Sequence, residues 1–192
     1  MNGAPIGIFD SGMGGLTVMR ALKARLPRES FIYLGDTARL PYGTKSADTV
    51  TRYAVQASRT LMTHGIKLLV VACNTASAAA VPILTERLAP LPVVGVIQPG
   101  AEAAVMSVPE GPIAVIATEG TVKGGAYVRA IQSLAPQMPV VQQACPLFVA
   151  LAEEGLRDGP ITELAAQRYL GPVLATIPGR AGWSWAAPIF RC

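Results

Sequence analysis

The sequence has little of what several classes of protein depend on. Three cysteines and one histidine in 192 residues predict neither a disulfide framework nor a histidine-based metal site. The basic residues are scattered, which argues against a nucleic-acid stripe or a polybasic membrane patch despite a net charge of +4. Its longest apolar runs, such as Leu68–Cys73, are far shorter than the roughly 20 residues of a membrane helix. No signal-peptide pattern opens the chain, so we expect a cytoplasmic protein.

Apolar residues, in contrast, make up 51% of the chain, and they come in short blocks. These blocks alternate with longer segments of helical period, which is typical of βα units and a mostly parallel sheet. The pattern predicts an α/β fold. Strands are expected over 6–10, 31–35, 68–72, 93–97, 113–117 and 140–144, and helices over 16–26, 46–65, the Ala-rich segment after 75, 125–134, 147–156 and 161–170.

The chain is long enough for two small domains. Residues 98–100 (QPG) look like a crossover between two series of βα units, which predicts a first domain over 1–97 and a second over 98–183. Ser46 is expected to cap the second helix, and Gly171–Pro172 to end or kink the last one. Residues 175–192 break the pattern and follow neither period.

Three polar clusters follow predicted strands. They are Asp10–Ser11, Asp36 with residues 41–43 (PYG), and residues 73–75 (CNT). The ligand crevice of an open α/β sheet lies outside the carboxyl ends of its strands. An acid, hydroxyls, an amide and a thiol at one edge therefore predict a small-molecule site.

The glycine-rich loop over residues 11–15 was weighed as a phosphate cradle. It lacks the lysine of a P-loop, and Thr17 stands where a dinucleotide fingerprint has its third glycine. A nucleotide site is therefore disfavoured, although the backbone N–H groups of the loop could hold a carboxylate.

Cys73 is the sharpest candidate for chemistry. It stands at a strand end where the next helix begins, and the dipole of that helix is expected to lower the thiol pKa and favour a base or nucleophile. The alternative is a small buried hydrophobic side chain. Because Asn74 and Thr75 are adjacent, we favour the reactive interpretation.

Other chemically capable residues have simpler explanations. Cys145 precedes a proline beside an apolar strand and is expected in the core. His64 is expected to cap helix carbonyls. Glu153 and Glu154 resemble a solvated helix face.

Five segments, taken in order, resemble motifs of the glutamate racemase family, within the cofactor-independent aspartate/glutamate racemases. They are residues 6–16 (IGIFDSGMGGL), 34–43 (LGDTARLPYG), 71–77 (VACNTAS), 120–127 (GTVKGGAY) and 144–149 (ACPLFV). The correspondence runs from about residue 5 to 174. Several long motifs in the family's order are far more specific than any single short pattern.

The resemblance implies two flavodoxin-like or Rossmann-like parallel-sheet domains that face each other across a cleft holding glutamate. It implies racemisation at Cα without pyridoxal phosphate: one cysteine thiolate removes the α-proton, and a second cysteine, as thiol, protonates the other face. Family members make D-glutamate for peptidoglycan in the bacterial cytoplasm. They form dimers in more than one arrangement, so a homodimer is expected without a chosen interface.

On this resemblance Cys73 is one of the two catalytic thiols, Asp10 orients and tunes it, and Glu153 assists the opposite thiol. The positions that match glutamate-binding residues are Asp10, Ser11, Tyr42, Gly43, Asn74, Thr75 and Thr121. Aspartate or another small amino acid is the alternative substrate. A non-catalytic glutamate-binding fragment is the alternative of a different class.

The sequence departs from the family where the second catalytic cysteine belongs. The motif Leu-Gly-Cys-Thr-His-Phe-Pro is absent, residues 182–192 (GWSWAAPIFRC) stand in its place, and the segment that completes the first domain in the family is missing. Codons can be chosen for residues 184–192 that, read from the third base, encode Leu-Gly-Cys-Thr-His-Phe-Pro-Leu. We therefore expect a frame-shifted tail over 184–192 and impaired racemisation. Cys192 would then not be the second thiol.

Overall fold

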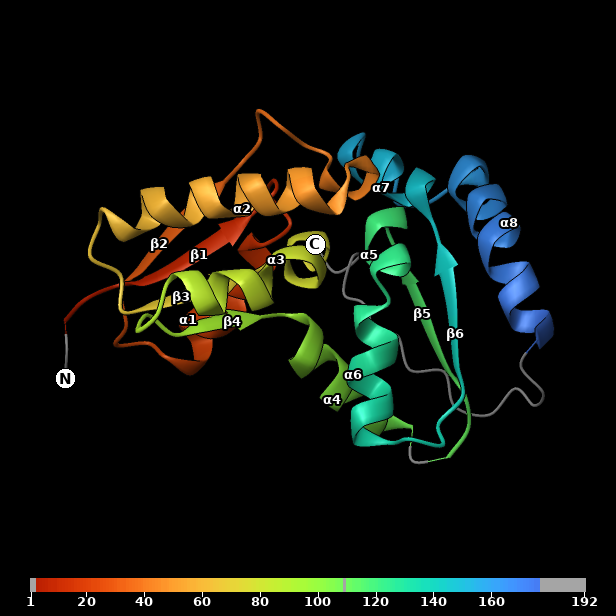
Figure 1. Ribbon diagram of the computed structural model, residues 1–192. Helices are drawn as coiled ribbons and strands as arrows, with labels where there is room; N and C mark the ends of the chain where they lie inside the picture. The colour runs from red at the N-terminus through yellow and green to blue at the C-terminus, as the bar shows by residue number, and fades with distance from the viewer. Residues whose placement is uncertain (1–2, 109, 177–192) are drawn as a thin grey trace. The chain divides into compact units, whose positions relative to one another are not determined.

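The computed structural model describes residues 3–108 and 110–176. The expected tail over 184–192 lies outside these residues. The chain divides into two compact units, the first ending at Ile97 and the second beginning at Gln98. Both are α/β with parallel strands, so the predicted fold class is confirmed (Figure 1).

The first unit contains a four-stranded parallel sheet in the order β2-β1-β3-β4. Its strands are β1 (Ile6–Asp10), β2 (Phe31–Gly35), β3 (Leu68–Val71) and β4 (Val93–Gly95). Asp10 lies opposite Gly35 on β2, and Phe9 lies opposite Val71 on β3. Because the strands are parallel, the segments that follow β1, β2 and β3 all leave from the same edge.

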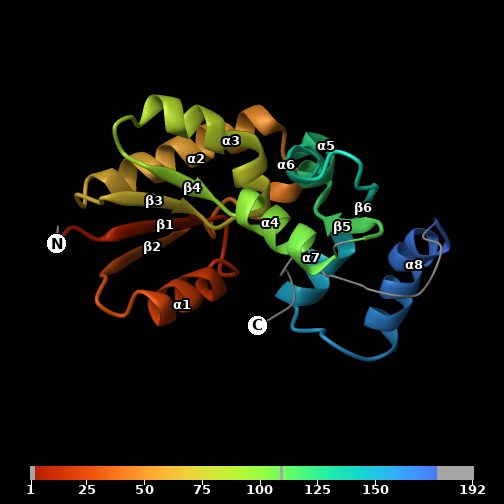
Figure 2. The same cartoon turned by 90° about the horizontal axis from the view of Figure 1, so that it is seen from below.

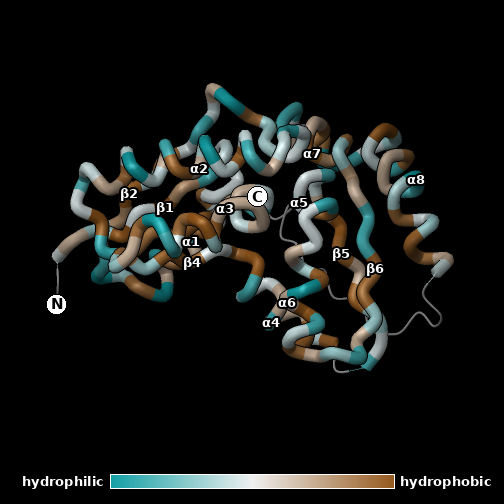
Figure 3. The backbone as a smooth tube through the Cα atoms, in the orientation of Figure 1, coloured by the Kyte–Doolittle hydropathy of each residue, from teal (hydrophilic) through white to brown (hydrophobic). Residues whose placement is uncertain are grey.

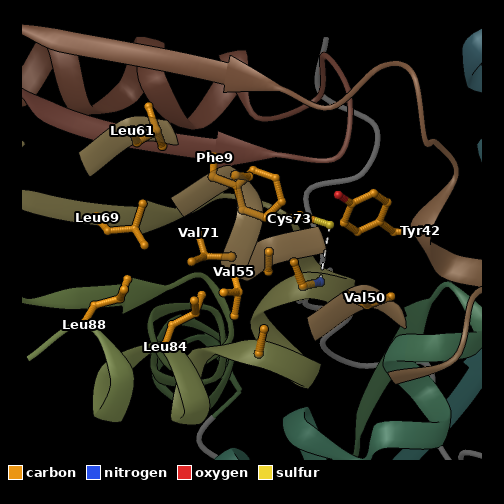
Figure 4. Close-up of a cluster of buried hydrophobic side chains, with 14 of the residues drawn as sticks. Phe9, Tyr42, Val50, Val55, Leu61, Leu69, Val71, Cys73, Leu84 and Leu88 are labelled. Atoms are coloured by element: carbon orange, nitrogen blue, oxygen red, sulfur yellow. Dashed lines mark hydrogen bonds between the residues drawn. The ribbon is translucent and has the colours of Figure 1, made fainter. Parts of the chain in front are cut away.

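Helices cover both faces of this sheet. Figure 2 shows α1 (Leu16–Arg25) on one face and α2 (Ala47–Met62) with α3 (Asn74–Arg87) on the other. The alternation of strand side chains explains this layering, because Ile6 and Ile8 pack toward α1 while Phe9 joins the α2 and α3 side. The apolar side chains form one buried cluster on each face of the sheet. Figure 4 shows the larger cluster, on the α2 and α3 side, which contains Tyr42 and Cys73.

The helix boundaries of the first unit agree with the sequence in part. The Oγ of Ser46 accepts a hydrogen bond from the backbone N–H of Thr49 at 3.2 Å, so the predicted cap of α2 is confirmed. Residues 98–100 lie where the second unit begins, and they are helical, because α4 (Ile97–Ser107) begins before them and shortens β4. Pro99 is the third residue of α4, where the missing N–H costs no intrahelical hydrogen bond.

The second unit pairs β5 (Ile113–Ala117) with β6 (Val140–Ala144) in a two-stranded parallel sheet. Figure 3 shows β5 as strongly apolar, whereas β6 includes a hydrophilic stretch at Gln142 and Gln143. The remaining elements are the short α5 (Glu119–Gly124), α6 (Ala126–Leu134), α7 (Pro146–Glu153) and α8 (Pro160–Thr176).

Of the two predicted effects of residues 171–172, the end of the last helix is wrong, because α8 continues to Thr176 with Pro172 inside it. A proline has a φ angle that suits a helix, and it removes one hydrogen bond without preventing the chain from continuing. No helix within residues 3–108 and 110–176 combines the length and apolarity needed to cross a membrane.

Candidate active site

The loop after β1 is built around the carboxylate of Asp10. Its Oδ2 accepts hydrogen bonds from the backbone N–H of Gly12 at 3.2 Å and of Gly15 at 2.9 Å. A Cβ on Gly15 would lie 2.7 Å from the Cβ of Asp10 and 3.0 Å from that of Ala72, so only glycine permits this close approach. The carboxylate that these two N–H groups hold is therefore the chain's own, which leaves them unavailable to a bound phosphate.

Tyr33, which was not among the residues predicted for the site, places its hydroxyl between the same carboxylate and the carbonyl oxygen of Gly12. Its hydroxyl lies 3.3 Å from Asp10 Oδ2 and 2.8 Å from the carbonyl oxygen of Gly12. Tyr33 is opposite Ile8 in the β1–β2 register, two rows before Asp10 and therefore on the same face of the sheet. The alternation of the two strands was the signal that could have revealed it.

Cys73 lies at the end of β3 and is the N-cap residue of α3. Its Sγ accepts a hydrogen bond from the backbone N–H of Ala76 at 3.4 Å and contacts the Oγ of Ser11 at 3.4 Å. The backbone N–H of Ser11 also faces the sulfur. Only 7% of the residue is exposed, and Figure 4 shows the sulfur directed toward the ring of Tyr42.

The pKa of the Cys73 thiol is raised above its ordinary value, contrary to the expectation from the helix dipole. Burial is the main cause, and the negative charge of Asp10 adds to it. The hydrogen bonds from Ser11 and Ala76 act in the opposite direction and stabilise the thiolate, but they do not outweigh the other two effects. Cys73 is therefore a thiol at neutral pH. The hydrogen-bond donors beside it would stabilise the thiolate if a positively charged group bound nearby.

We expect the raised pKa to be visible in the alkylation of Cys73 by iodoacetamide. Below its pKa the thiolate fraction of a cysteine rises about tenfold per pH unit. The rate at Cys73, followed by peptide mass spectrometry, should therefore keep climbing through pH 9. A plateau below pH 8.5 would indicate the lowered pKa that the helix dipole alone predicts.

A second buried cluster follows β2. The hydroxyl of Tyr42 donates to Asp36 Oδ2, and the Nε of Arg39 forms an ion pair with the same oxygen at 2.6 Å. The guanidinium of Arg39 lies 4.2 Å from the centroid of the Tyr53 ring. Burial and the bond to Asp36 raise the pKa of Tyr42, which is 1% exposed. Its hydroxyl is thus engaged by Asp36, and substrate binding by Tyr42 and Gly43 stays a prediction.

The first turn of α3 completes this edge of the sheet. Thr75 is buried and Asn74 half-buried, and both directly follow Cys73. Ser77 donates to the carbonyl of Val71 at 2.8 Å and accepts from the N–H of Val96 at 3.2 Å, which ties β3 to the segment after β4. The structure therefore gathers Asp10, Ser11, Cys73, Asn74 and Thr75 along neighbouring strand ends, as the sequence predicted.

Comparison with known proteins decides the family. A model described as Asp/Glu/Hydantoin racemase matches residues 6–170. The chain belongs to this racemase family. It is 54% identical over 165 residues to the glutamate racemase of Geobacter metallireducens, which covers 86% of this chain and 61% of that protein.

Solved structures of glutamate racemases agree with this assignment. The Francisella tularensis enzyme in complex with D-glutamate is 41% identical, with a TM-score of 0.84 over 90% of this chain and 64% of its own. The Escherichia coli enzyme, solved with L-glutamate and the activator UDP-MurNAc-ala, is 34% identical, with a TM-score of 0.70 over 89% and 64%. The chain thus spans just over six-tenths of the length of these relatives.

The remaining residues that the racemase resemblance singled out lie in the second unit. Thr121 is 1% exposed on α5, and its Oγ1 lies 3.0 Å from that of Thr118. Glu153 is exposed at the last residue of α7. Their roles toward glutamate stay predictions.

Cys145 is part of the core of the second unit, as the sequence predicted. It is 3% exposed and packs with Phe148 and Leu151. Its thiol lies 3.6 Å from the carbonyl of Gln143, and burial raises its pKa to about 11. Within residues 3–108 and 110–176, no group of three or more His, Cys, Asp or Glu side chains is placed to hold a metal ion.

Proposed function

We propose that this chain transfers the α-proton of glutamate through Cys73, within the interconversion of L- and D-glutamate that supplies peptidoglycan synthesis in the cytoplasm. The observation that carries the proposal is the setting of Cys73. A buried thiol faces the hydroxyl and N–H of Ser11 beside the carboxylate of Asp10, in a chain 54% identical to a glutamate racemase. The strand order β2-β1-β3-β4 supports the flavodoxin-like arrangement of the first unit.

The proposed step needs a thiolate at Cys73. The Cα–H bond of the amino acid breaks, its proton joins Sγ, and the electron pair stays on the substrate as a carbanion stabilised toward its carboxylate. The N–H of Ala76 donates to the sulfur, and the hydroxyl of Ser11 accepts from the thiol and can turn to donate to a thiolate, so both groups hold the sulfur in position. Asp10 disfavours the thiolate while the site is empty, so a substrate ammonium group nearby would be the charge that allows it to form.

Protonation of the opposite face needs a second acid. Cys145 does not fit this role because its side chain is packed in the core of the second unit. The Leu-Gly-Cys-Thr-His-Phe-Pro motif does not occur in the 192 residues. We therefore propose that this polypeptide exchanges the α-proton faster than it inverts the configuration, and that Glu153 would serve the opposite face when a second thiol is present.

Two other functions would give different results. A racemase of aspartate or another small amino acid would exchange that α-proton in preference to that of glutamate. A non-catalytic fragment would bind glutamate without any exchange. Glutamate is favoured because two of the solved relatives hold D-glutamate and L-glutamate.

The test is proton exchange in D₂O followed by ¹H NMR with L-glutamate, D-glutamate, L-aspartate and D-aspartate. The proposal predicts loss of the α-proton signal from glutamate in proportion to enzyme, with inversion lagging behind exchange. Saturable glutamate binding by calorimetry with no exchange at any enzyme concentration would support the non-catalytic fragment. Faster exchange of aspartate would replace glutamate as the substrate.

A further inference from the structure

The hydroxyl of Tyr33, on β2, contacts two groups of the segment that ends β1 and begins the following loop. It lies 2.8 Å from the carbonyl of Gly12 and 3.3 Å from Oδ2 of Asp10. The ring of Tyr33 packs with Ile6 and Ile8 on the α1 side of the sheet. The packing of the ring does not require a hydroxyl. The contact between the hydroxyl and the buried carboxylate of Asp10 therefore needs its own explanation.

We propose that Tyr33 is a positioning residue for Asp10: its hydroxyl completes the set of donors that fixes the Asp10 carboxylate beside Cys73. The proposal rests on the proposed role of Cys73 in proton transfer. Oδ2 of Asp10 then faces the N–H groups of Gly12 and Gly15 and the hydroxyl of Tyr33, whose single hydrogen it shares with the carbonyl oxygen of Gly12. None of the quoted motifs contains Tyr33, which precedes the second of them by one residue.

The consequence for Cys73 follows from charge. A hydrogen bond to a carboxylate oxygen draws negative charge toward the donor and holds the group in one orientation. Asp10 raises the pKa of Cys73, while the hydrogen bonds from Ser11 and Ala76 lower it. Without the Tyr33 hydroxyl the full charge of Asp10 acts on the sulfur, and the thiolate becomes harder to form.

The test is a double-mutant cycle of Tyr33→Phe and Asp10→Asn in the full 192-residue chain. The measurement is the rate of iodoacetamide alkylation at Cys73 between pH 7 and 9, resolved by peptide mass spectrometry. We expect Tyr33→Phe to slow Cys73 about threefold and Asp10→Asn to accelerate it. In the Asp10→Asn background, Tyr33→Phe should have no effect, because the charge it modulates is absent.

Two controls separate this role from a structural one. Tyr53→Phe removes a hydroxyl from α2 in the same unit and keeps the ring that contacts Arg39, so the Cys73 rate should not change. Cys145 is buried, and its alkylation reports loosening of the chain in every sample. Faster alkylation of Cys145 in Tyr33→Phe, or an equal effect of Tyr33→Phe with and without Asp10, would overturn the proposal.

This readout does not depend on turnover. If glutamate exchange is absent in every variant while the alkylation cycle shows coupling, the proposed function fails and the positioning of Asp10 by Tyr33 stands. If exchange is present and the cycle shows no coupling, the function stands and the role of Tyr33 is refuted.

Discussion

Cys73→Ala is expected to lower the rate of glutamate α-proton exchange by about 10²- to 10⁴-fold, the range that a positioned general base contributes. In the proposed step the sulfur receives the proton, and alanine has no atom that can do so. The α-hydrogen is a very weak acid, so water entering the small space left by the sulfur cannot replace a desolvated thiolate. The measurement is the loss of the α-proton signal in D₂O at equal concentrations of folded protein.

Two further variants show whether the loss comes from chemistry. Cys73→Ser keeps a polar group that can bond to Ser11 and to the N–H of Ala76, but its hydroxyl is a far weaker acid than a thiol, so exchange should also be lost. Cys145→Ala removes the other described thiol from the core of the second unit and should retain exchange wherever the protein remains folded. Exchange that survives Cys73→Ala unchanged would exclude Cys73 as the base.

The strands could be predicted because the apolar pattern of each strand lies within its own segment of the sequence. The short apolar runs at β1 and β3 indicate buried strands, and both strands were found with the expected bounds to within one residue. The polar residues after them were also predictable, since parallel strands place their carboxyl ends at one edge. The early start of α4 was not predicted, because the strand was expected to continue to residue 97, where α4 instead begins with Pro99 in its first turn.

The electrostatics of the site were harder to predict than its composition. The sequence showed that a helix begins at Cys73, and the dipole argument gave a lowered pKa. It did not show that the thiol is 7% exposed and that Asp10 lies close enough to oppose its ionisation. Desolvation depends on contacts between segments far apart in the chain, such as Tyr42 and Phe9 around β3, and local spacing carries no information on it.

Tyr33 is a second residue whose contacts could not be predicted from its own segment of the sequence. A tyrosine within a strand is ordinarily a packing residue, and its ring does pack against the α1 side. Its hydroxyl gains a second role only because β2 lies beside β1 in a register that brings Tyr33 within reach of Asp10. Strand order and register decide this contact, and neither can be predicted from the sequence of one strand alone.

Asp36→Ala is expected to reduce the free energy of unfolding by about 2–4 kcal/mol, the cost of leaving buried polar partners unsatisfied. Asp36 accepts from the hydroxyl of Tyr42 and pairs with Arg39, and its side chain is 8% exposed. Without the carboxylate, the hydroxyl of Tyr42 stays in the core beside Phe9 and Cys73 with its acceptor removed. Urea unfolding of the full chain measures the change.

The chain offers a matched control in Asp48, which also pairs with an arginine but on an open helix surface. Its carboxylate lies 3.6 Å from the Nε of Arg52 and is 86% exposed, so Asp48→Ala should change stability by no more than about 0.5 kcal/mol. Tyr42→Phe combined with Asp36→Ala should cost less than the sum of the two single changes, because the pair then leaves no buried hydroxyl without an acceptor. Equal effects of Asp36→Ala and Asp48→Ala would show that the Asp36 cluster contributes no more than a surface ion pair, and the Tyr42 hydroxyl would then have another partner in solution.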